Sequence, residues 1–212
     1  AHVSLLNYGI KHSHAYDWWK NVVNVMIEKD PGDVRIPRLR VIHLYEHDFG
    51  LFLALFWKRM LRSSEGRGTI NAGQYGGRAG MEAQSLVFLE EIKTEISTLS
   101  RKSLVNFDND AASCYDRILP SLASLIGRKK GLHTNVVYVH ATTLQEAKYK
   151  LKTAMGVSDE FYRHCSSSPI YGTGQGSTNS PVIWIIISST LFDIHNQKAH
   201  GAIFCSPDQS TS

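Results

Sequence analysis

The stretch Leu104–Leu119, LVNFDNDAASCYDRIL, constrains the fold most, because its hydrophobic pattern changes period within a few residues. Residues 104–107 have the pattern of a short strand with one buried face. From about residue 111 the apolar residues follow helical spacing: Ala111, Cys114, Tyr115, Ile118, Leu119 and Leu122. An aspartate held at a strand tip is a ligand that Mg²⁺ accepts. Asp110 could equally cap the helix, so the stretch alone leaves a metal site and a helix cap open.

Composition indicates a globular chain with one core or two subdomains that share one. The 212 residues are 42% hydrophobic and 20% charged, and the net charge of +4 suits a polyanionic partner. The first dozen residues do not look like a secretory signal, and the longest apolar run, Pro181–Ile187, is too short to span a bilayer. Three widely spaced cysteines predict no disulfide framework. We therefore expect an intracellular protein, nuclear or cytoplasmic, with no membrane partner and no disulfide-linked partner.

Hydrophobic periodicity predicts several further elements. We expect helices over Tyr16–Ile27, with its adjacent tryptophans in the core, and over Asp48–Arg62, Met81–Leu99 and Thr134–Met155. A strand is expected over Val34–His43. Val182–Ile194 is so rich in β-branched residues that periodicity allows a strand or a buried helix, and Gly201–Ser212 reads as a loop or short strand.

Two motifs resemble those of reverse transcriptases, especially the enzymes of group II introns and non-LTR retrotransposons. Asp110-x-x-x-Cys114-Tyr115-Asp116 is similar to their first catalytic motif, which ends in a small residue, an aromatic residue and Asp. The segment Tyr171–Pro181, YGTGQGSTNSP, is similar to the Gly-x-x-Gln-Gly-Ser-x-x-Ser-Pro motif that follows in the palm. The two motifs occur in the family's order.

The resemblance implies an α+β fold, the fingers–palm of a right-hand polymerase, with an incomplete palm sheet and packed helices. Residues 1–33 would be a helical N-terminal extension, 34–103 a fingers-like region and 104–212 a partial palm. The implied function is that of an RNA-directed DNA polymerase of a retroelement, in which template-directed nucleotidyl transfer uses two metal ions. The implied partners are an RNA or DNA template with primer and a dNTP, and the implied cofactor is Mg²⁺ (or Mn²⁺).

For the nucleotide, the resemblance assigns roles residue by residue. Asp110 matches the catalytic, metal-binding aspartate, and Tyr115 matches the aromatic residue under the sugar, where a ring excludes a 2′-hydroxyl. Arg38 and Arg40 belong to a segment similar to the fingers motif that contacts the incoming nucleotide, although a solvated strand face would also explain them. Gln175 and Gly176 match the block that supports template and nucleotide, which completes the nucleotide-binding set. Asp108 receives no metal role, and Asp116 is expected to support the local structure.

For the template and primer, the resemblance points to Gln74, Gly76 and Arg78, because Gln-x-Gly-x-Arg precedes a long helix in retroelement enzymes. A flexible loop is the competing explanation of that glycine-rich segment. Gly174 is added because a glycine lets a backbone approach a base pair and sugar closely.

One departure from the family pattern limits the expected activity. The third family motif contains Asp-Asp, and this sequence contains no Asp-Asp and ends at about that point. We therefore expect a fragment that is inactive as it stands. A non-catalytic nucleic-acid-binding module with a polymerase-like fold is the alternative. A remote alternative is a zinc metallopeptidase through His43-x-x-Glu46-His47, which needs both histidines on one helix face and a third ligand.

Overall fold

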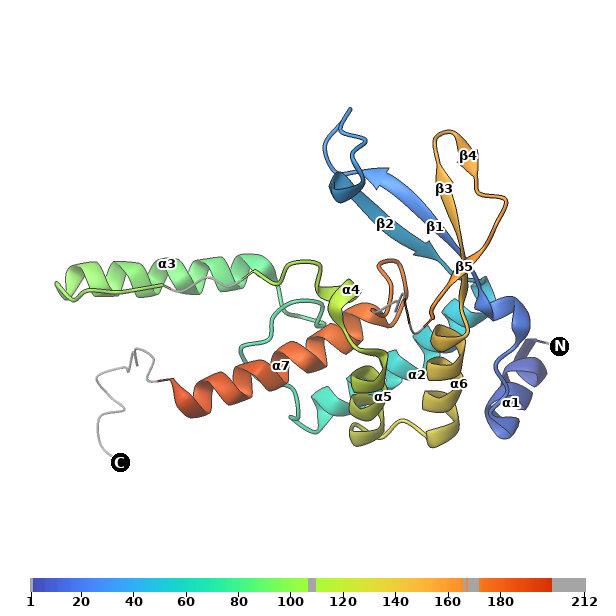
Figure 1. The fold of residues 1–212 in the computed structure, drawn as a ribbon. Coiled ribbons are helices and arrows are strands. Elements are labelled where there is room, and N and C mark those ends of the chain that lie inside the picture. The colour runs from blue at the N-terminus through green and yellow to red at the C-terminus, as the bar shows by residue number, and fades with distance from the viewer. Residues whose placement is uncertain (1, 107–109, 166, 168–171, 200–212) are drawn as a thin grey trace. The chain divides into compact units, whose positions relative to one another are not determined.

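The computed structural model describes residues 2–106, 110–165, 167 and 172–199, a mixed α/β arrangement of helices and one small open sheet (Figure 1). The chain divides into two compact units. The first contains Ala1–Thr69 and Ser113–Trp184, and the second contains Ile70–Ala112 and Ile185–Ser212. The expected divisions at residues 33 and 103 do not coincide with these limits.

The sheet belongs to the first unit and mixes parallel and antiparallel pairs. Its strands are β1 (Asn21–Glu28), β2 (Leu39–Leu44), β3 (Lys148–Thr153), β4 (Gly156–Val157) and β5 (Tyr162–Arg163). They run in the order β2-β1-β3-β4, and β5 also pairs with β3. The β1/β3 pair is parallel and the other pairs are antiparallel. Figure 1 shows β1 between β2 and β3.

The helix predicted over Tyr16–Ile27 is wrong. After α1 (His2–His12), a 3₁₀ turn, η1 (Asp17–Lys20), leads directly into β1. Its run of Val and Ile favours a strand, because β-branched side chains pack well on a pleated sheet. Residues 1–33 are thus not a purely helical extension. Trp19 lies in the core as expected, whereas Trp18 is 43% exposed and stacks on Tyr16.

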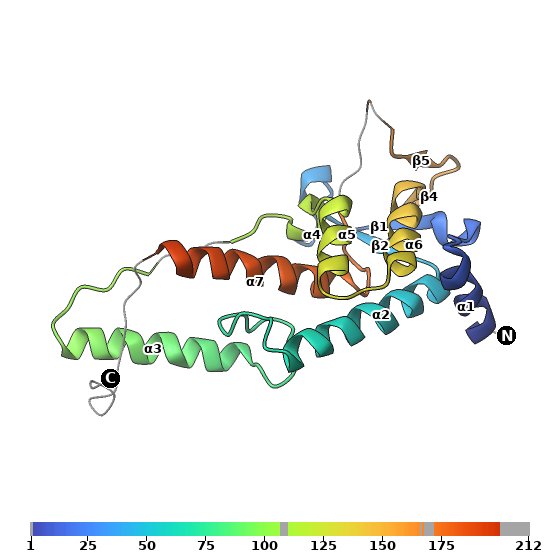
Figure 2. The same ribbon diagram turned by 90° about the horizontal axis from the view of Figure 1, so that it is seen from below.

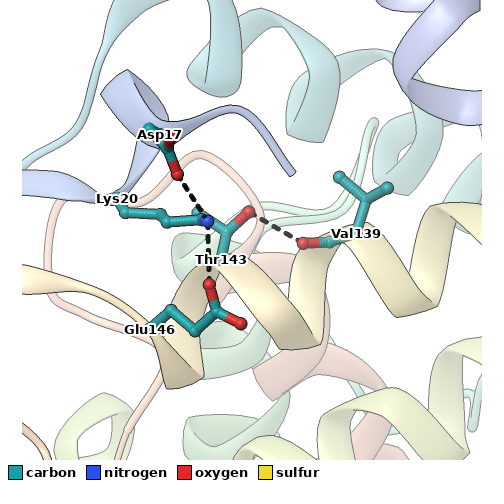
Figure 3. A network of polar contacts seen from close by, with 5 residues as sticks. All are labelled: Asp17, Lys20, Val139, Thr143 and Glu146. Carbon is teal, nitrogen blue, oxygen red and sulfur yellow. Dashed lines mark hydrogen bonds and ion pairs between the residues drawn. The ribbon is translucent and has the colours of Figure 1, made fainter. Parts of the chain in front are cut away.

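Ion pairs connect the segments that lie just before the two parallel strands, β1 and β3. The Lys20 ammonium, just before β1, lies 2.9 Å from Asp17 and 2.8 Å from Glu146, which precedes β3 (Figure 3). Burial acts to lower the pKa of Lys20, but its bonds to Glu146 and Asp17 raise that pKa on balance. The contact links the segments that precede β1 and β3.

The strand predicted over Val34–His43 forms only in its second half. Residues Ile36–Arg38 make a 3₁₀ turn, η2, which contains Pro37, and β2 begins at Leu39. Proline has no backbone N–H to donate to a neighbouring strand, so the turn precedes the pairing.

Helices cover the rest of the first unit. The predicted helix over Asp48–Arg62 is confirmed as α2 (His47–Gly66), which has Glu46 as its cap residue and buries Phe49, Phe52 and Trp57 among others. The helix predicted over Thr134–Met155 is right only to the end of α6 (Thr134–Gln145), because β3 follows. Helices α1 and α5 (Pro120–Lys129) both pack against α6, and Figure 2 shows α5 beside α6.

The stretch that opens the sequence analysis folds differently from its prediction. Residues 104–106 have no regular secondary structure, and Asp108 lies outside the described residues. The predicted helix is split into α4 (Cys114–Arg117) and α5, because a residue before proline is driven out of the helical region. Leu119, which precedes Pro120, has an extended backbone (φ −69°, ψ 125°). Ile118 is buried as expected, but Leu119 is 48% exposed.

The second unit contains the predicted long helix, α3 (Ala83–Leu99), and most of α7 (Ser180–Lys198), which decides for a helix over Val182–Ile194. Ser97 is the buried residue of α3, whereas apolar residues of this helix such as Leu89, Ile96 and Leu99 are exposed. Within the described residues no helix has the length and apolar character needed to cross a membrane, and neither Cys114 nor Cys165 is in a disulfide. The expectation for Gly201–Ser212 lies outside the described residues.

Candidate functional site

The glycine-rich loop, residues 172–177, fits closely against two other segments of the first unit. Gly172, Gly174 and Gly176 all have positive φ (99°, 80° and 108°), a region that favours glycine. A Cβ atom at Gly172 would lie 2.8 Å from the Tyr115 carbonyl oxygen, and one at Gly176 would lie 2.7 Å from the His43 carbonyl oxygen. Glycine therefore lets the loop lie directly between α4 and the end of β2.

Backbone hydrogen bonds fix the loop in this position. The Gly172 and Thr173 amides donate to the carbonyls of Ile118 (2.9 Å) and Tyr115 (3.0 Å). The Gln175 carbonyl accepts a hydrogen bond from the His43 amide (2.6 Å) on the edge of β2.

Ser180, the first residue of α7, reinforces the loop. Its hydroxyl lies 3.0 Å from the carbonyl oxygen of Thr173 and 2.9 Å from that of Gly174. The Ser180 hydroxyl thus helps to hold the loop at the place where α4, the end of β2 and residues 172–177 meet.

Of the two predicted arginines, one lies on the strand that the loop contacts. Arg40 lies on β2 and is exposed, and it shares a sheet face with Ile42, whose Cγ2 atom would be 3.1 Å from a Cβ at Gly176. Arg38 is also exposed but belongs to the 3₁₀ turn η2, so the predicted strand that would align Arg38 with Arg40 is wrong. The structure thus brings Arg40, but not Arg38, onto the strand that the loop contacts.

Burial favours the uncharged forms of His43, Tyr45 and Tyr115, which lie beside the loop. It lowers the pKa of His43, an effect only partly offset by the Asp116 carboxylate and by a hydrogen bond involving Gln175. Burial also raises the pKa of Tyr115, with a further contribution from Cys114, and raises that of Tyr45 well above its ordinary value. At neutral pH the imidazole and both phenols are therefore neutral.

A groove of about 370 Å³ opens beside the loop, in the first unit. Its lining consists of residues 43–47 at the end of β2, the first turns of α2, and residues 176–178. The Thr178 hydroxyl donates to the Gly50 carbonyl (2.9 Å), which connects the loop to α2. The Nδ1 atom of His43 is buried and has no hydrogen-bond partner among the described residues.

The histidine motif His43-x-x-Glu46-His47 lacks the geometry of a zinc peptidase. His43 is on β2 and His47 is the first residue of α2, so the two imidazoles are not one helical turn apart on a single helix. Within the part of the chain that the structure describes, no group of three or more His, Cys, Asp or Glu side chains could hold a metal ion.

The second unit holds the remaining predicted residues. Gln74 is buried, its Oε1 accepts from the Ser188 hydroxyl (2.7 Å), and its Nε2 donates to the Gly76 carbonyl (3.2 Å). Arg78 Nη1 donates to the carbonyls of Gln74 (2.9 Å) and Asn71 (3.2 Å). Both side chains therefore hold the glycine-rich segment of residues 71–78 in place, which a flexible loop would not require.

Asp110, the predicted catalytic residue, is exposed and also belongs to the second unit. It offers a single carboxylate, and the described residues around it supply no further metal ligands that would complete a site. The described residues thus do not make up a site for Mg²⁺ or Mn²⁺, and the cofactor stays a prediction.

Two comparisons with known proteins found no relatives. No model of a known protein family matches the chain, and no curated protein matches it significantly. The structure does bring Tyr115, Gly174, Gln175 and Gly176 together at the loop, and Arg40 lies on the strand that the loop contacts. Sequence reasoning missed the loop's contacts with His43 and Tyr45, and singled out His43 only through the zinc motif.

Proposed function

We propose that this chain is the fingers–palm region of a reverse transcriptase of the non-LTR retrotransposon or group II intron type. The observation that supports this most is the meeting of β2, α4 and residues 172–177. These segments are far apart in the sequence, and they carry Arg40, Tyr115, Gln175 and Gly176, which are all of the assigned nucleotide-binding residues except Arg38. A chance match of two short motifs gives no reason for the matching segments to fold against one another.

The proposed ligand is a deoxynucleoside triphosphate. Arg40 is an exposed cation on a strand next to the loop, and a guanidinium binds phosphate oxygens through charge-assisted, often bidentate hydrogen bonds. Tyr115 is half-buried and its backbone carbonyl contacts the loop; its phenol is neutral, so the ring would offer an apolar surface to a sugar. A ribose 2′-hydroxyl placed against that ring would lose its hydrogen bonds to water, which favours the deoxy sugar.

Nucleotide-dependent binding tests this proposal on the chain itself. The measurement is the dissociation rate of a primer–template with a dideoxy-terminated primer, with and without the complementary dNTP. We expect the matching dNTP to slow dissociation and Arg40→Ala to weaken that effect about tenfold, the loss of one charge-assisted contact. Arg128→Ala, an exposed arginine at the end of α5, is the matched control and should behave as the wild type. No effect of any dNTP would exclude the proposed site.

Asp110 is tested separately, in a longer polypeptide that joins this chain to an Asp-Asp hairpin. There, Asp110→Ala should abolish primer extension and leave primer–template binding intact. Retained extension would refute the catalytic role. Primer–template binding that never responds to dNTP would instead support the non-catalytic nucleic-acid-binding module, which also predicts that Asp110→Ala leaves binding unchanged.

A further inference from the structure

The strand register gives one face of the sheet an unusual charge pattern. Residues that pair directly across strands share a face, so Ile27 and Arg40 lie on the same side as Val23 and Lys150. Every charged residue on that face within the paired strands is a cation: Arg40, Lys148, Lys150, Lys152 and Arg163. We name these five residues the cationic face. The acid in the same strands, Glu28, pairs with Leu39 on the opposite face.

The opposite face forms part of the core, whereas the cationic face is open. Val22 and Asn24 alternate with Val23 and Val25 along β1, and the first two are buried while the second two are only half-buried. Beside them on the open side, Ile27 is 48% and Leu44 is 50% exposed. The cations therefore border a partly exposed apolar strip, which consists of Val23, Val25, Ile27 and Leu44.

The lysines of β3 are available to a ligand. Among the described residues, none of Lys148, Lys150 and Lys152 forms an ion pair. The Lys150 ammonium lies 4.8 Å from the centre of the Phe161 ring, which is 49% exposed. The charge of Lys148 contributes to lowering the pKa of Asp17, but Asp17 forms its ion pair with Lys20.

We propose that the cationic face binds the phosphodiester backbone of a single nucleic-acid strand that runs along β3. Alternate residues of a strand are about 6.6 Å apart, so the three lysines form a straight row with a regular repeat. A regular row suits a linear polyanion with evenly spaced phosphates better than it suits an isolated phosphate. The apolar strip and Phe161 give the bases and sugars a surface beside that row.

The row also continues into the candidate nucleotide site. Arg40 and Ile42 lie on the same face, and Ile42 is close enough to Gly176 of the loop that a Cβ atom there would lie 3.1 Å from its Cγ2 atom. A strand bound along β3 and β1 would therefore lead towards the loop. Only the choice of nucleic acid as the ligand rests on the proposed function. Binding to the cationic face requires no primer, no dNTP and no Asp110.

The test is the salt dependence of binding to an unstructured oligonucleotide. The probe is fluorescein-labelled oligo-dT of about 20 nucleotides, followed by fluorescence anisotropy, with no primer or dNTP present. The variant is Lys148→Gln/Lys150→Gln/Lys152→Gln. Three lost phosphate contacts should reduce the slope of log K against log salt by about 2. Raising the salt from about 50 to about 200 mM should then weaken the wild type about 20-fold more than the variant.

The matched control removes three exposed cations from α2, in the variant Lys58→Gln/Arg59→Gln/Arg62→Gln. It makes the same change in net charge and should keep the wild-type slope. The triple Lys→Arg variant of β3 should also bind as the wild type, because it keeps the three positive charges. Equal slopes for the two Gln variants would overturn the proposal. It would also be overturned if the β3 Gln variant bound oligo-dT as the wild type does and lost only its binding to anionic lipid vesicles. If the β3 Gln variant alone had the reduced slope but no dNTP affected primer–template binding, only the proposed nucleotide site would be contradicted.

Discussion

At the residue scale, the loop depends on glycines that leave no room for a side chain. Gly176 has φ +108° and its missing Cβ would lie 2.7 Å from a backbone oxygen of β2, which cannot move away as a side chain would. Gly32 has a similar φ of +85°, but a Cβ there would have no atom within 4 Å. The two positions separate backbone strain from steric exclusion.

We predict that Gly32→Ala costs about 1–2 kcal/mol, the strain of a left-handed backbone alone. Gly176→Ala should cost about 2–5 kcal/mol, since overpacking against β2 adds to the same strain. Urea unfolding of both variants measures the difference. Gly176→Ala should also abolish the dNTP effect on primer–template binding, whereas Gly32→Ala should preserve it. Equal destabilisation by the two substitutions would mean that the loop does not contact β2 as described.

A buried histidine should make the stability of the protein depend on pH. Burial lowers the pKa of His140 from 6.5 to about 4, and its Nε2 atom lies 2.9 Å from the Asn179 amide nitrogen. Between these two pH values the unfolded chain binds a proton that the folded chain does not. His140 therefore costs stability as pH falls through that window, by about 1.4 kcal/mol for each pH unit.

The matched variant is His140→Gln, which keeps a polar group at the site but does not titrate. Urea unfolding at pH 7 and pH 5 should show a smaller loss of stability for the variant than for the wild type. His43, whose pKa burial also lowers, contributes equally to both proteins. Identical pH dependence of the two proteins would show that His140 is not buried as a neutral imidazole.

At the element scale, the sequence predicted those helices whose apolar face has a clear period, such as α2. The prediction failed where a segment with helical spacing also contains residues that favour a strand. The Tyr16–Ile27 segment has apolar residues at helical spacing, but its valines favour a strand that pairs with the remote β3. Thr134–Met155 is similar, because the second half pairs with β1. A single sequence cannot show that two such segments meet, since pairing is decided by the register between distant residues.

For the site, sequence motifs identified the glycine-rich loop and Tyr115 but not what the glycines touch. His43 packs against the loop because β2 ends beside it, and no spacing in the sequence indicates this contact. Gln74 and Arg78 illustrate the opposite case. Their motif suggests a ligand contact, whereas their hydrogen bonds are made to the loop that contains them.

Two glycines in helices allow a prediction about elements. Gly127 in α5 is buried, and a Cβ there would lie 2.9 Å from Leu132 Cδ1 and 3.2 Å from the Trp57 ring. Gly50 in α2 has open space around it. Because alanine favours helix by about 1 kcal/mol over glycine, Gly50→Ala should stabilise the protein by up to about 1 kcal/mol. Gly127→Ala should instead destabilise it by about 1–2 kcal/mol, since overpacking exceeds that gain.

Thermal unfolding of both variants, followed by circular dichroism, should show melting temperatures shifted in opposite directions. Stabilisation by both substitutions would mean that α5 has room to move away from Trp57, and so that the packing of α5 is looser than described.

At the scale of the whole molecule, burial is distributed unevenly along the chain. Seven residues of α2 are buried, among them Phe49, Phe52 and Trp57, whereas α3 buries Ser97 alone. Large apolar residues of α3 are exposed, with Phe88 at 61%. A helix of this length has little stability in water by itself, because most helical stability in proteins comes from packing.

Hydrogen exchange followed by mass spectrometry should therefore separate the two helices. We predict that peptides from α3 exchange at least about 100-fold faster than peptides from α2, which corresponds to an opening free energy about 3 kcal/mol lower. Peptides from α6, whose Val136 and Val139 are fully buried, serve as a second slow reference. If α3 were protected as strongly as α2 in the free protein, its apolar side would be covered in solution. In that case Phe88 would be covered rather than exposed in the free protein.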